Sequence, residues 1–440
     1  MSAPADVGVA TTLGTALLTR RSPAKVAGRA TSVTRGPAVV RDPAVFFTDP
    51  NLNEQALFTV GAAGYGAAEY GEFATAVAAV HAGGDSYPAF YRAFRDLGLL
   101  ASRSGHEALA RGHRAAARGA FLRAASYLAS SLYVAIGTRR PRRQAAAYRV
   151  MNDAWEHAAG LLEPAAEKVR IHYGPASLPG WLLRPAGAAP GRRRPTIIFS
   201  GGSDAQFIGQ YVSGAAEAAA HGYNALLFEG PGQGALLYLR RLGLRPDWET
   251  VITPVVEYLL GRPDVDPGRI ALVGSRQGGA LAARAAAAEH RLAALVLDPG
   301  VSDPMTAFHL PPALIALART EPGAADQAWA KIFTRLPASV QFGFTAASYP
   351  FRQPVFSALV QSLAEYGTAG CLPRITAPAL VTQYQGEAAY PGQGAAAAAL
   401  LGPAATLHEF TAAGGCRFHQ APMAPQRRSR VLFDWLAGVL

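Results

Sequence analysis

The chain has 440 residues, half of them hydrophobic, which is enough to bury a large core and to form more than one domain. The net charge of +11 comes almost wholly from arginine, because lysine occurs only at positions 25, 168 and 331. The arginines are scattered and form no basic stripe with aromatic residues, so the composition argues against a nucleic-acid-binding protein.

Cys371 and Cys416 are too few for a disulfide framework and lack the spacing of metal ligands, which fits a reducing compartment. The pair Arg20-Arg21 is not followed by the apolar run that export requires. No stretch of ~18 uncharged apolar residues predicts a membrane span. We therefore expect a cytoplasmic protein without a membrane segment, a metal or a cofactor.

The first part of the chain divides into two segments. Residues 1–45 are rich in Ala, Thr, Pro and Arg with little periodicity, which predicts a flexible N-terminal extension. Residues 46–165 show helical spacing of apolar residues, as at Phe73, Val77 and Val80, and predict an all-helical domain. Its histidines are interpreted as surface or packing residues: His81, His106 and His113.

From residue 166 to 440, strand and helix patterns alternate. A hairpin is predicted over 169–183. Buried strands are predicted at 195–199, 224–228, 270–273, 294–297 and 379–382. The helices between them are predicted at 211–221, 249–260, 278–289, 393–401 and 431–440. This alternation predicts an open, mostly parallel, doubly wound α/β sheet that binds ligands at the carboxyl ends of its strands.

The segment Ile270–Gly279 joins an apolar strand to a Gly-Ser-Arg-Gln-Gly turn. This is the pattern of a nucleophile elbow, in which the strand turns sharply into a helix and the middle side chain enters the active site. A serine hydrolase has its nucleophile there, whereas this chain has Arg276. A guanidinium stays protonated and cannot attack a carbonyl group, but it can hold a carboxylate, phenolate or enolate.

Other strand ends carry candidate catalytic groups. Gly201 and Gly202 can direct backbone N–H groups at an oxyanion, with the N–H of Gln277 as a second donor, although simple turn formation is an alternative. His419 follows a predicted strand at 406–410 and is the strongest candidate for acid–base catalysis, although a single histidine is usually structural.

Glu387 precedes His419 in the order expected of an acid and a histidine that act together, and it can orient the imidazole. A glutamate in a loop is more often only solvated. Three further carboxylates at strand ends are candidates for substrate binding: Glu229, Asp298 and Asp303. For the two aspartates, capping of the next helix is an equal alternative.

Several motifs together resemble one family from about residue 52 to the end. They are Pro195–Asp204 (PTIIFSGGSD), Phe228–Gly234 (FEGPGQG), Arg245–Glu249 (RPDWE), the elbow, Asp298–Val301 (DPGV), Tyr390–Gln393 (YPGQ) and Phe433–Leu436 (FDWL). The chain is similar to the α/β-hydrolases that include 2,6-dihydropseudooxynicotine hydrolase, the FrsA-type esterases and the fungal Ayg1-type polyketide hydrolases.

The resemblance implies an α/β-hydrolase fold with an N-terminal helical domain that covers the catalytic domain. It also implies a serine–acid–histidine triad and small ketones, esters or polyketides as substrates. Carried over to this chain, the histidine is His419, the acid is Glu387, and the oxyanion donors are Gly202, Ser203 and Gln277. The nucleophile does not carry over, because Ser275 and Arg276 stand as though the serine and its neighbour had exchanged places.

These observations leave three hypotheses. The first is a non-hydrolytic enzyme of polyketide-like secondary metabolism, such as antibiotic biosynthesis, that catalyses cyclisation, dehydration or C–C cleavage with His419 as acid–base and Arg276 as anion holder. The second is a hydrolase that uses Ser275 or an activated water. The third is a pseudohydrolase that binds a ligand or a protein without turnover. The expected partner is a small molecule, a polyketide-like or aromatic ketone or ester. A homodimer is a further alternative that the sequence does not decide.

Overall fold

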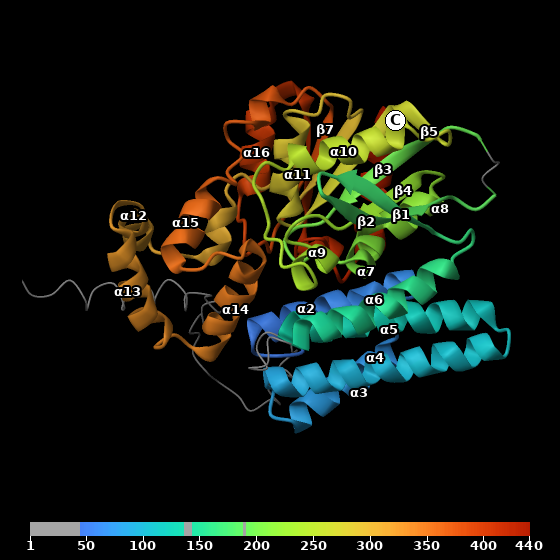
Figure 1. The fold of residues 1–440 in the computed structure, drawn as a ribbon, viewed down its shortest axis with the longest axis horizontal. Coiled ribbons are helices and arrows are strands. Elements are labelled where there is room, and N and C mark those ends of the chain that lie inside the picture. The colour runs from blue at the N-terminus through green and yellow to red at the C-terminus, as the bar shows by residue number, and fades with distance from the viewer. Residues whose placement is uncertain (1–44, 136–142, 188–190) are drawn as a thin grey trace, which may run out of the picture.

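The computed structural model describes residues 45–135, 143–187 and 191–440. A bundle of long helices packs below an eight-stranded sheet, and a lobe of shorter helices lies beside both (Figure 1). The extension predicted at residues 1–45 lies outside the described residues, except for Val45. The division of the chain into separate domains at residues 46 and 166 stays a prediction.

The helical bundle consists of five α-helices in sequence, and small residues bring two of them close together. Their bounds are α2 Pro50–Gly61, α3 Tyr70–Ala82, α4 Tyr87–Ala110, α5 Arg114–Val134 and α6 Arg143–Gly160. Gly98 of α4 faces α5 so closely that a Cβ there would lie 2.6 Å from Cγ of Leu128. The predicted stripe of Phe73, Val77 and Val80 is buried in this bundle.

The eight strands form one mixed, mostly parallel sheet, as the alternating pattern predicts. The strands are β1 Glu167–Tyr173, β2 Ala176–Leu183, β3 Arg194–Ser200, β4 Asn224–Phe228, β5 Val265–Ser275, β6 Ala294–Asp298, β7 Ala379–Tyr384 and β8 Ala405–Phe410. Their order is β1-β2-β4-β3-β5-β6-β7-β8, and only the pairs β1–β2 and β2–β4 are antiparallel. The antiparallel hairpin predicted over 169–183 is thus confirmed.

Helices cover both faces of the sheet, because successive side chains of a strand point to opposite faces. Ile197 and Phe199 of β3 share a core with the helical bundle, and Ile198 lies in the core on the other face. These helices are α7 Phe207–Gln210, a π-helical turn Tyr211–Ala215, α8 Ala216–Ala220, α9 Gly234–Tyr238, α10 Glu249–Leu260, α11 Gly278–Ala286, α16 Gln393–Leu401 and α17 Pro425–Val439. The predicted last helix begins six residues earlier than expected, at Pro425.

The lobe between β6 and β7 was not predicted from the sequence. It contains α12 Pro312–Thr320, α13 Pro322–Phe333, α14 Ala338–Ser348 and α15 Phe356–Ala364. It packs on the bundle where the ring of Phe342 stacks on Tyr87 with centroids 3.9 Å apart, and where Asn51 donates a hydrogen bond to the carbonyl of Ser339. The bundle and this lobe therefore meet above the strand ends.

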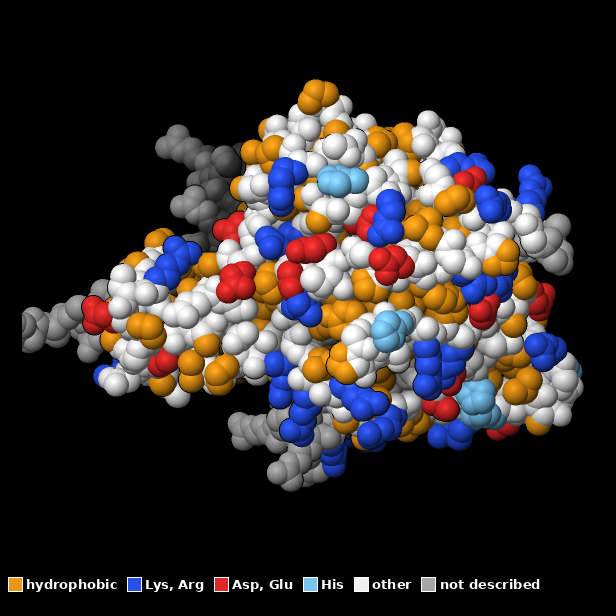
Figure 2. Space-filling view, turned by 45° about the horizontal axis from the view of Figure 1, so that its top comes forward, with side chains coloured by type: hydrophobic (Ala, Val, Ile, Leu, Met, Phe, Trp, Pro, Cys, Tyr) orange, Lys and Arg blue, Asp and Glu red, His pale blue; other side chains and the backbone are white. Residues whose placement is uncertain are grey.

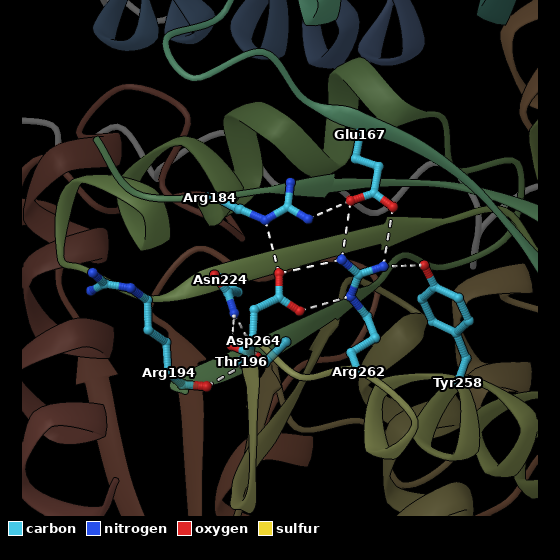
Figure 3. Close-up of polar contacts among 8 residues, drawn as sticks. All are labelled: Glu167, Arg184, Arg194, Thr196, Asn224, Tyr258, Arg262 and Asp264. Atoms are coloured by element: carbon cyan, nitrogen blue, oxygen red, sulfur yellow. Dashed lines mark hydrogen bonds and ion pairs between the residues drawn. The ribbon is translucent and has the colours of Figure 1, made fainter. Parts of the chain in front are cut away.

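A closed ring of four charges lies at the amino-terminal end of β5 (Figure 3). The guanidinium of Arg262 contacts Glu167 and Asp264 at 3.0 Å each, and Arg184 contacts the same two carboxylates. These guanidinium groups outweigh the effect of burial and hold the pKa values of both carboxyls below their usual range. The ring joins β1 and β2 to the loop between α10 and β5 at the end of the sheet opposite to the ligand-binding edge.

Over the face shown in Figure 2, basic side chains occur at several separate places, with acidic side chains between them. No helix within the described ranges is both long enough and apolar enough to cross a membrane.

A buried ion pair fixes the carboxyl ends of the central strands. Asp298, at the end of β6, is fully buried, and its carboxylate accepts hydrogen bonds from Thr382 and Tyr384 of β7, each at 2.5 Å. The same carboxylate pairs with Arg428 of α17, which is also buried and whose Nε lies 2.6 Å away. The prediction that Asp298 binds substrate is therefore wrong, because its oxygens are engaged in the core.

Replacing Arg428 by methionine should lower the free energy of unfolding by about 3–5 kcal/mol, because the carboxylate of Asp298 would stay buried without its counter-ion. Arg430→Met is the matched control two residues along the same helix, since Arg430 is exposed and lies 3.8 Å from its partner Asp434. Urea unfolding of the two variants checks this. Equal stabilities would contradict a stabilising role for the pair.

Candidate active site

The turn after β5 has the geometry of an elbow, with Arg276 at its apex. Arg276 has φ 59°, a left-handed conformation that is unfavourable for an arginine, and its N–H donates a hydrogen bond to the carbonyl of Asp298 at 2.8 Å. A Cβ on Gly274 would lie 2.3 Å from the carbonyl oxygen of Gly278, so glycine is required there. This backbone directs the Arg276 side chain away from the sheet.

A cavity of about 710 Å³ lies above the apex, between the helical bundle and the lobe. The bundle contributes Glu54 and Tyr133 to its wall, and the lobe contributes Trp329 and Phe344. The sheet side supplies residues from the strand ends, namely Gly202, Ser203, Asp204, Arg276, Gln277, Tyr390 and His419. The volume is within the usual range for a small-molecule site.

The guanidinium of Arg276 is held by two side chains one turn apart on α2. Its Nη2 lies 3.0 Å from Oε1 of Glu54, and its central carbon lies over the ring of Phe58, 4.9 Å from the centroid. Burial alone would lower the pKa of Arg276, but Glu54 and Asp204 outweigh it and raise that pKa above its usual value. The side chain therefore remains a cation, and 39% of its surface is exposed.

The imidazole of His419 lies between two carboxylates. Its Nδ1 is 3.3 Å from Oε2 of Glu387, and its Nε2 is 3.7 Å from Oε1 of Glu54. Burial would raise the pKa of Glu387, but His419 and the N–H groups of Ala389 and Tyr390 hold it below its usual value. Glu387 is thus an ionised group that can orient the imidazole.

Ser275 is the last residue of β5 and lines a smaller cavity of about 160 Å³ on the bundle side of Arg276. Within the described ranges, no hydrogen bond joins Ser275 to His419. A serine nucleophile requires a base within hydrogen-bond reach. The arrangement of these two residues is therefore not that of an activated serine.

The glycine-rich loop after β3 packs against the elbow. A Cβ on Gly202 would lie 3.1 Å from the backbone nitrogen of Gln277, so the loop and the start of α11 are in contact. The side-chain amide of Gln233 donates hydrogen bonds to the carbonyls of Gly201 and Gly202 at 2.8 and 3.0 Å. The Gln233 side chain thus binds both carbonyls and holds in place the loop that carries the candidate donors Gly202 and Ser203.

Asp204 ends this loop and was not singled out by the sequence. It lines both cavities, has φ 59°, and its N–H donates a hydrogen bond to the carbonyl of Gly232 at 2.9 Å. Burial raises the pKa of its carboxyl to about 6, with Glu54 adding to the rise and Arg276 opposing it. Glu54 was missed as well, because a carboxylate in a helical segment far from the elbow has no sequence signal.

Two further predicted substrate-binding residues are not among those that line the large cavity. Glu229 is fully buried and accepts hydrogen bonds from the hydroxyl of Tyr148 on α6 and the N–H of Ala235, both at 2.7 Å, and burial raises its pKa to about 7. Asp303 is exposed and accepts a hydrogen bond from the N–H of Met305 as a helix cap. Glu229 therefore joins the bundle to the sheet and does not face the large cavity, and Asp303 is a helix cap, which is the alternative that the sequence left open for it.

Potential metal ligands occur outside this site. In the described part of the chain, His106 of α4 lies close to Asp153 and His157 of α6, with ligand atoms within 4.8 Å of one another. Both imidazoles pack on the ring of Phe121, which agrees with the expected packing role of His106.

Comparison with solved structures identifies the fold. A 2,6-dihydroxy-pseudo-oxynicotine hydrolase matches 80% of this chain and 88% of its own, with a TM-score of 0.61 and 20% identity. AbyA5 matches 78% of this chain and 89% of its own, with a TM-score of 0.50 and 18% identity. The chain has the α/β-hydrolase fold. At these identities the likeness concerns the fold alone.

Curated relatives of this α/β-hydrolase-fold chain are fungal proteins named hydrolases. The alpha/beta hydrolase ucsC of Acremonium sp. is 33% identical over 264 residues, which are 56% of this chain and 53% of ucsC. Gibberella moniliformis has a 20-hydroxy-prefusarin hydrolase, FUS2, that is 33% identical over 54% of this chain and 58% of FUS2. The chain thus spans about half the length of these relatives. No family model matches the chain.

The carboxyl of Asp204 should titrate near pH 6 in this α/β-hydrolase-fold protein. Arg276→Gln should raise its pKa further by removing the attracting cation, and Glu54→Gln should lower it by removing a repelling anion. NMR of protein labelled at the aspartate carboxyl carbon measures both shifts. Titration near 3.8 in the wild type would contradict the burial of this group.

Proposed function

We propose that the protein is an enzyme of secondary metabolism that acts on a small polyketide-like or aromatic ketone or ester by proton transfer. One observation carries this proposal: Arg276 occupies the elbow apex at the cavity, beside His419 and Glu387. The apex is where an acyl-enzyme would form, and a guanidinium cannot form one.

Arg276 and the loop N–H groups of Gly202, Ser203 and Gln277 would stabilise negative charge that develops on a carbonyl oxygen. Such donors are most effective when they are already oriented and partly shielded from water. His419 would be the acid–base group, oriented by Glu387. Cyclisation, dehydration and C–C cleavage next to a carbonyl group can each proceed through an enolate or a phenolate, so this set of groups suits any of the three.

The named relatives support a small secondary metabolite as the substrate class. One of them is a 20-hydroxy-prefusarin hydrolase, and others bear hydrolase names from fungi. The open cavity of about 710 Å³ also favours a ligand-binding enzyme over a pseudohydrolase whose pocket has been filled by side chains.

A second candidate function is hydrolysis by Ser275. The observation in its favour is that Ser275 lines the smaller cavity and is therefore not sealed in the core. Its weakness is that no base is hydrogen-bonded to Ser275 among the residues that the structure describes. A fluorophosphonate probe that labels wild-type Ser275 would favour this candidate over proton-transfer chemistry.

Incubation with ketone and ester intermediates of polyketide pathways, followed by mass spectrometry, tests the proposal. For a substrate found in this way, His419→Ala should lower turnover by roughly a hundredfold or more, since the acid–base group is lost. His408→Ala, on β8 outside the cavity, is the control. An unchanged rate in His419→Ala would rule out His419 as the proton-transfer group.

Exchanging the two elbow residues tests the role of the apex. The double variant Ser275→Arg with Arg276→Ser should gain ester hydrolysis and fluorophosphonate labelling, because a serine would then stand at the apex near His419. The wild type should show neither, and the native activity should fall in the variant. A folded double variant that neither labels nor hydrolyses would count against a working Glu387–His419 pair.

A further inference from the structure

A carboxylate of the helical bundle is more exposed at the cavity than either His419 or Glu387. Glu54 lines the large cavity, and 37% of its side chain is exposed, against 15% for His419. The Nε2 atom of His419 is buried and has no hydrogen-bond partner within the described residues. A substrate in the cavity would therefore meet Glu54 before it reached the imidazole nitrogen.

Glu54 is also the present counter-ion of Arg276. Its Oε1 lies 3.0 Å from the guanidinium and 3.7 Å from Nε2 of His419, so one oxygen stands between the two groups. The ring of Phe58, one turn later on α2, packs on Arg276 and on His419. Its centroid lies 4.9 Å from the central carbon of the guanidinium and 5.7 Å from the centroid of the imidazole. α2 thus holds the carboxylate at a defined place between a cation and a base.

We propose that Glu54 is a catalytic base that takes a proton from the carbon next to a substrate carbonyl group. The enolate formed in this way then replaces Glu54 as the counter-ion of Arg276. The inference rests on the proposed function and names its substrate class as an enolisable ketone or ester. The C–H bond breaks and an O–H bond forms on Glu54. The electron pair of the C–H bond becomes the carbon–carbon π bond of the enolate, and the π pair of the carbonyl group moves to its oxygen. That oxygen then pairs with the guanidinium.

This exchange keeps the charge beside Arg276 constant. Before the transfer the guanidinium is balanced by the carboxylate of Glu54, and afterwards by the enolate, while Glu54 is neutral. A partly buried site is stabilised when it holds no unpaired charge at either stage. The proton on Glu54 can then pass to Nε2 of His419, which returns it to the product or to a leaving group.

The test measures binding of dimedone, a cyclic diketone that is an enolate at neutral pH, and so does not depend on turnover. Calorimetry in two buffers of different ionisation enthalpy reports proton uptake. The wild type should bind dimedone with uptake of a proton, because Glu54 loses its counter-ion. Glu54→Gln should bind on the order of fivefold tighter and with less proton uptake than the wild type, because the competing carboxylate is gone and Asp204 is left to gain part of a proton.

Matched variants make the outcome decisive. Glu107→Gln, at an exposed pair on α4, should behave as the wild type, Glu54→Asp should retain proton uptake, and Arg276→Gln should not bind. The other ionisable groups around Glu54 are His419, Asp204, Tyr133 and Tyr390.

Proton uptake in Glu54→Gln as large as in the wild type would overturn the inference. If His419→Gln abolished the uptake instead, the imidazole would be the acceptor, and the proposed function would stand without a role for Glu54. Failure of Glu54→Gln to bind dimedone would also overturn the inference, since its Arg276 has no competing anion. In contrast, the proposed function itself would be contradicted if His419→Ala turned over the substrate at an unchanged rate.

Discussion

A full positive charge at the apex of the elbow is the constraint on which the site depends. The backbone turn is left-handed and tightly packed, so the residue at its apex must enter the cavity. Because that residue is Arg276, the space above it needs a counter-ion, and α2 supplies Glu54 at 3.0 Å. The helical bundle therefore contributes a charged group to the candidate site as well as covering the sheet.

The rigidity of the strand ends makes this arrangement possible. The buried pair of Asp298 and Arg428 joins β6, β7 and α17 directly beneath the elbow, whose apex N–H bonds to the carbonyl of the same aspartate. Gln233 holds the neighbouring glycine loop from below. Paired buried polar groups restrict the geometry of the strand ends, so the donors around Arg276 are oriented before any ligand binds.

The chemistry proposed for this cavity separates two functions that a serine hydrolase combines at one residue. Serine at an apex both meets the substrate and exchanges a proton with the histidine. Here Arg276 would stabilise the negative charge, and Glu54 with His419 would transfer the proton. Asp204, at the far end of the glycine loop with a pKa near 6, adds a group whose charge is sensitive to its distance from Arg276.

The sequence by itself determined the sheet, the elbow and the pairing of Glu387 with His419, because these depend on local periodicity, glycine spacing and chain order. Tertiary structure decided the rest. Glu54 and the lobe of α12–α15 reach the cavity only through packing between segments far apart in the chain. Asp298 and Glu229 stand at strand ends like active-site residues, yet Arg428 and Tyr148 bind them in the core, and no local pattern reveals a partner that is more than a hundred residues away, as Arg428 is from Asp298.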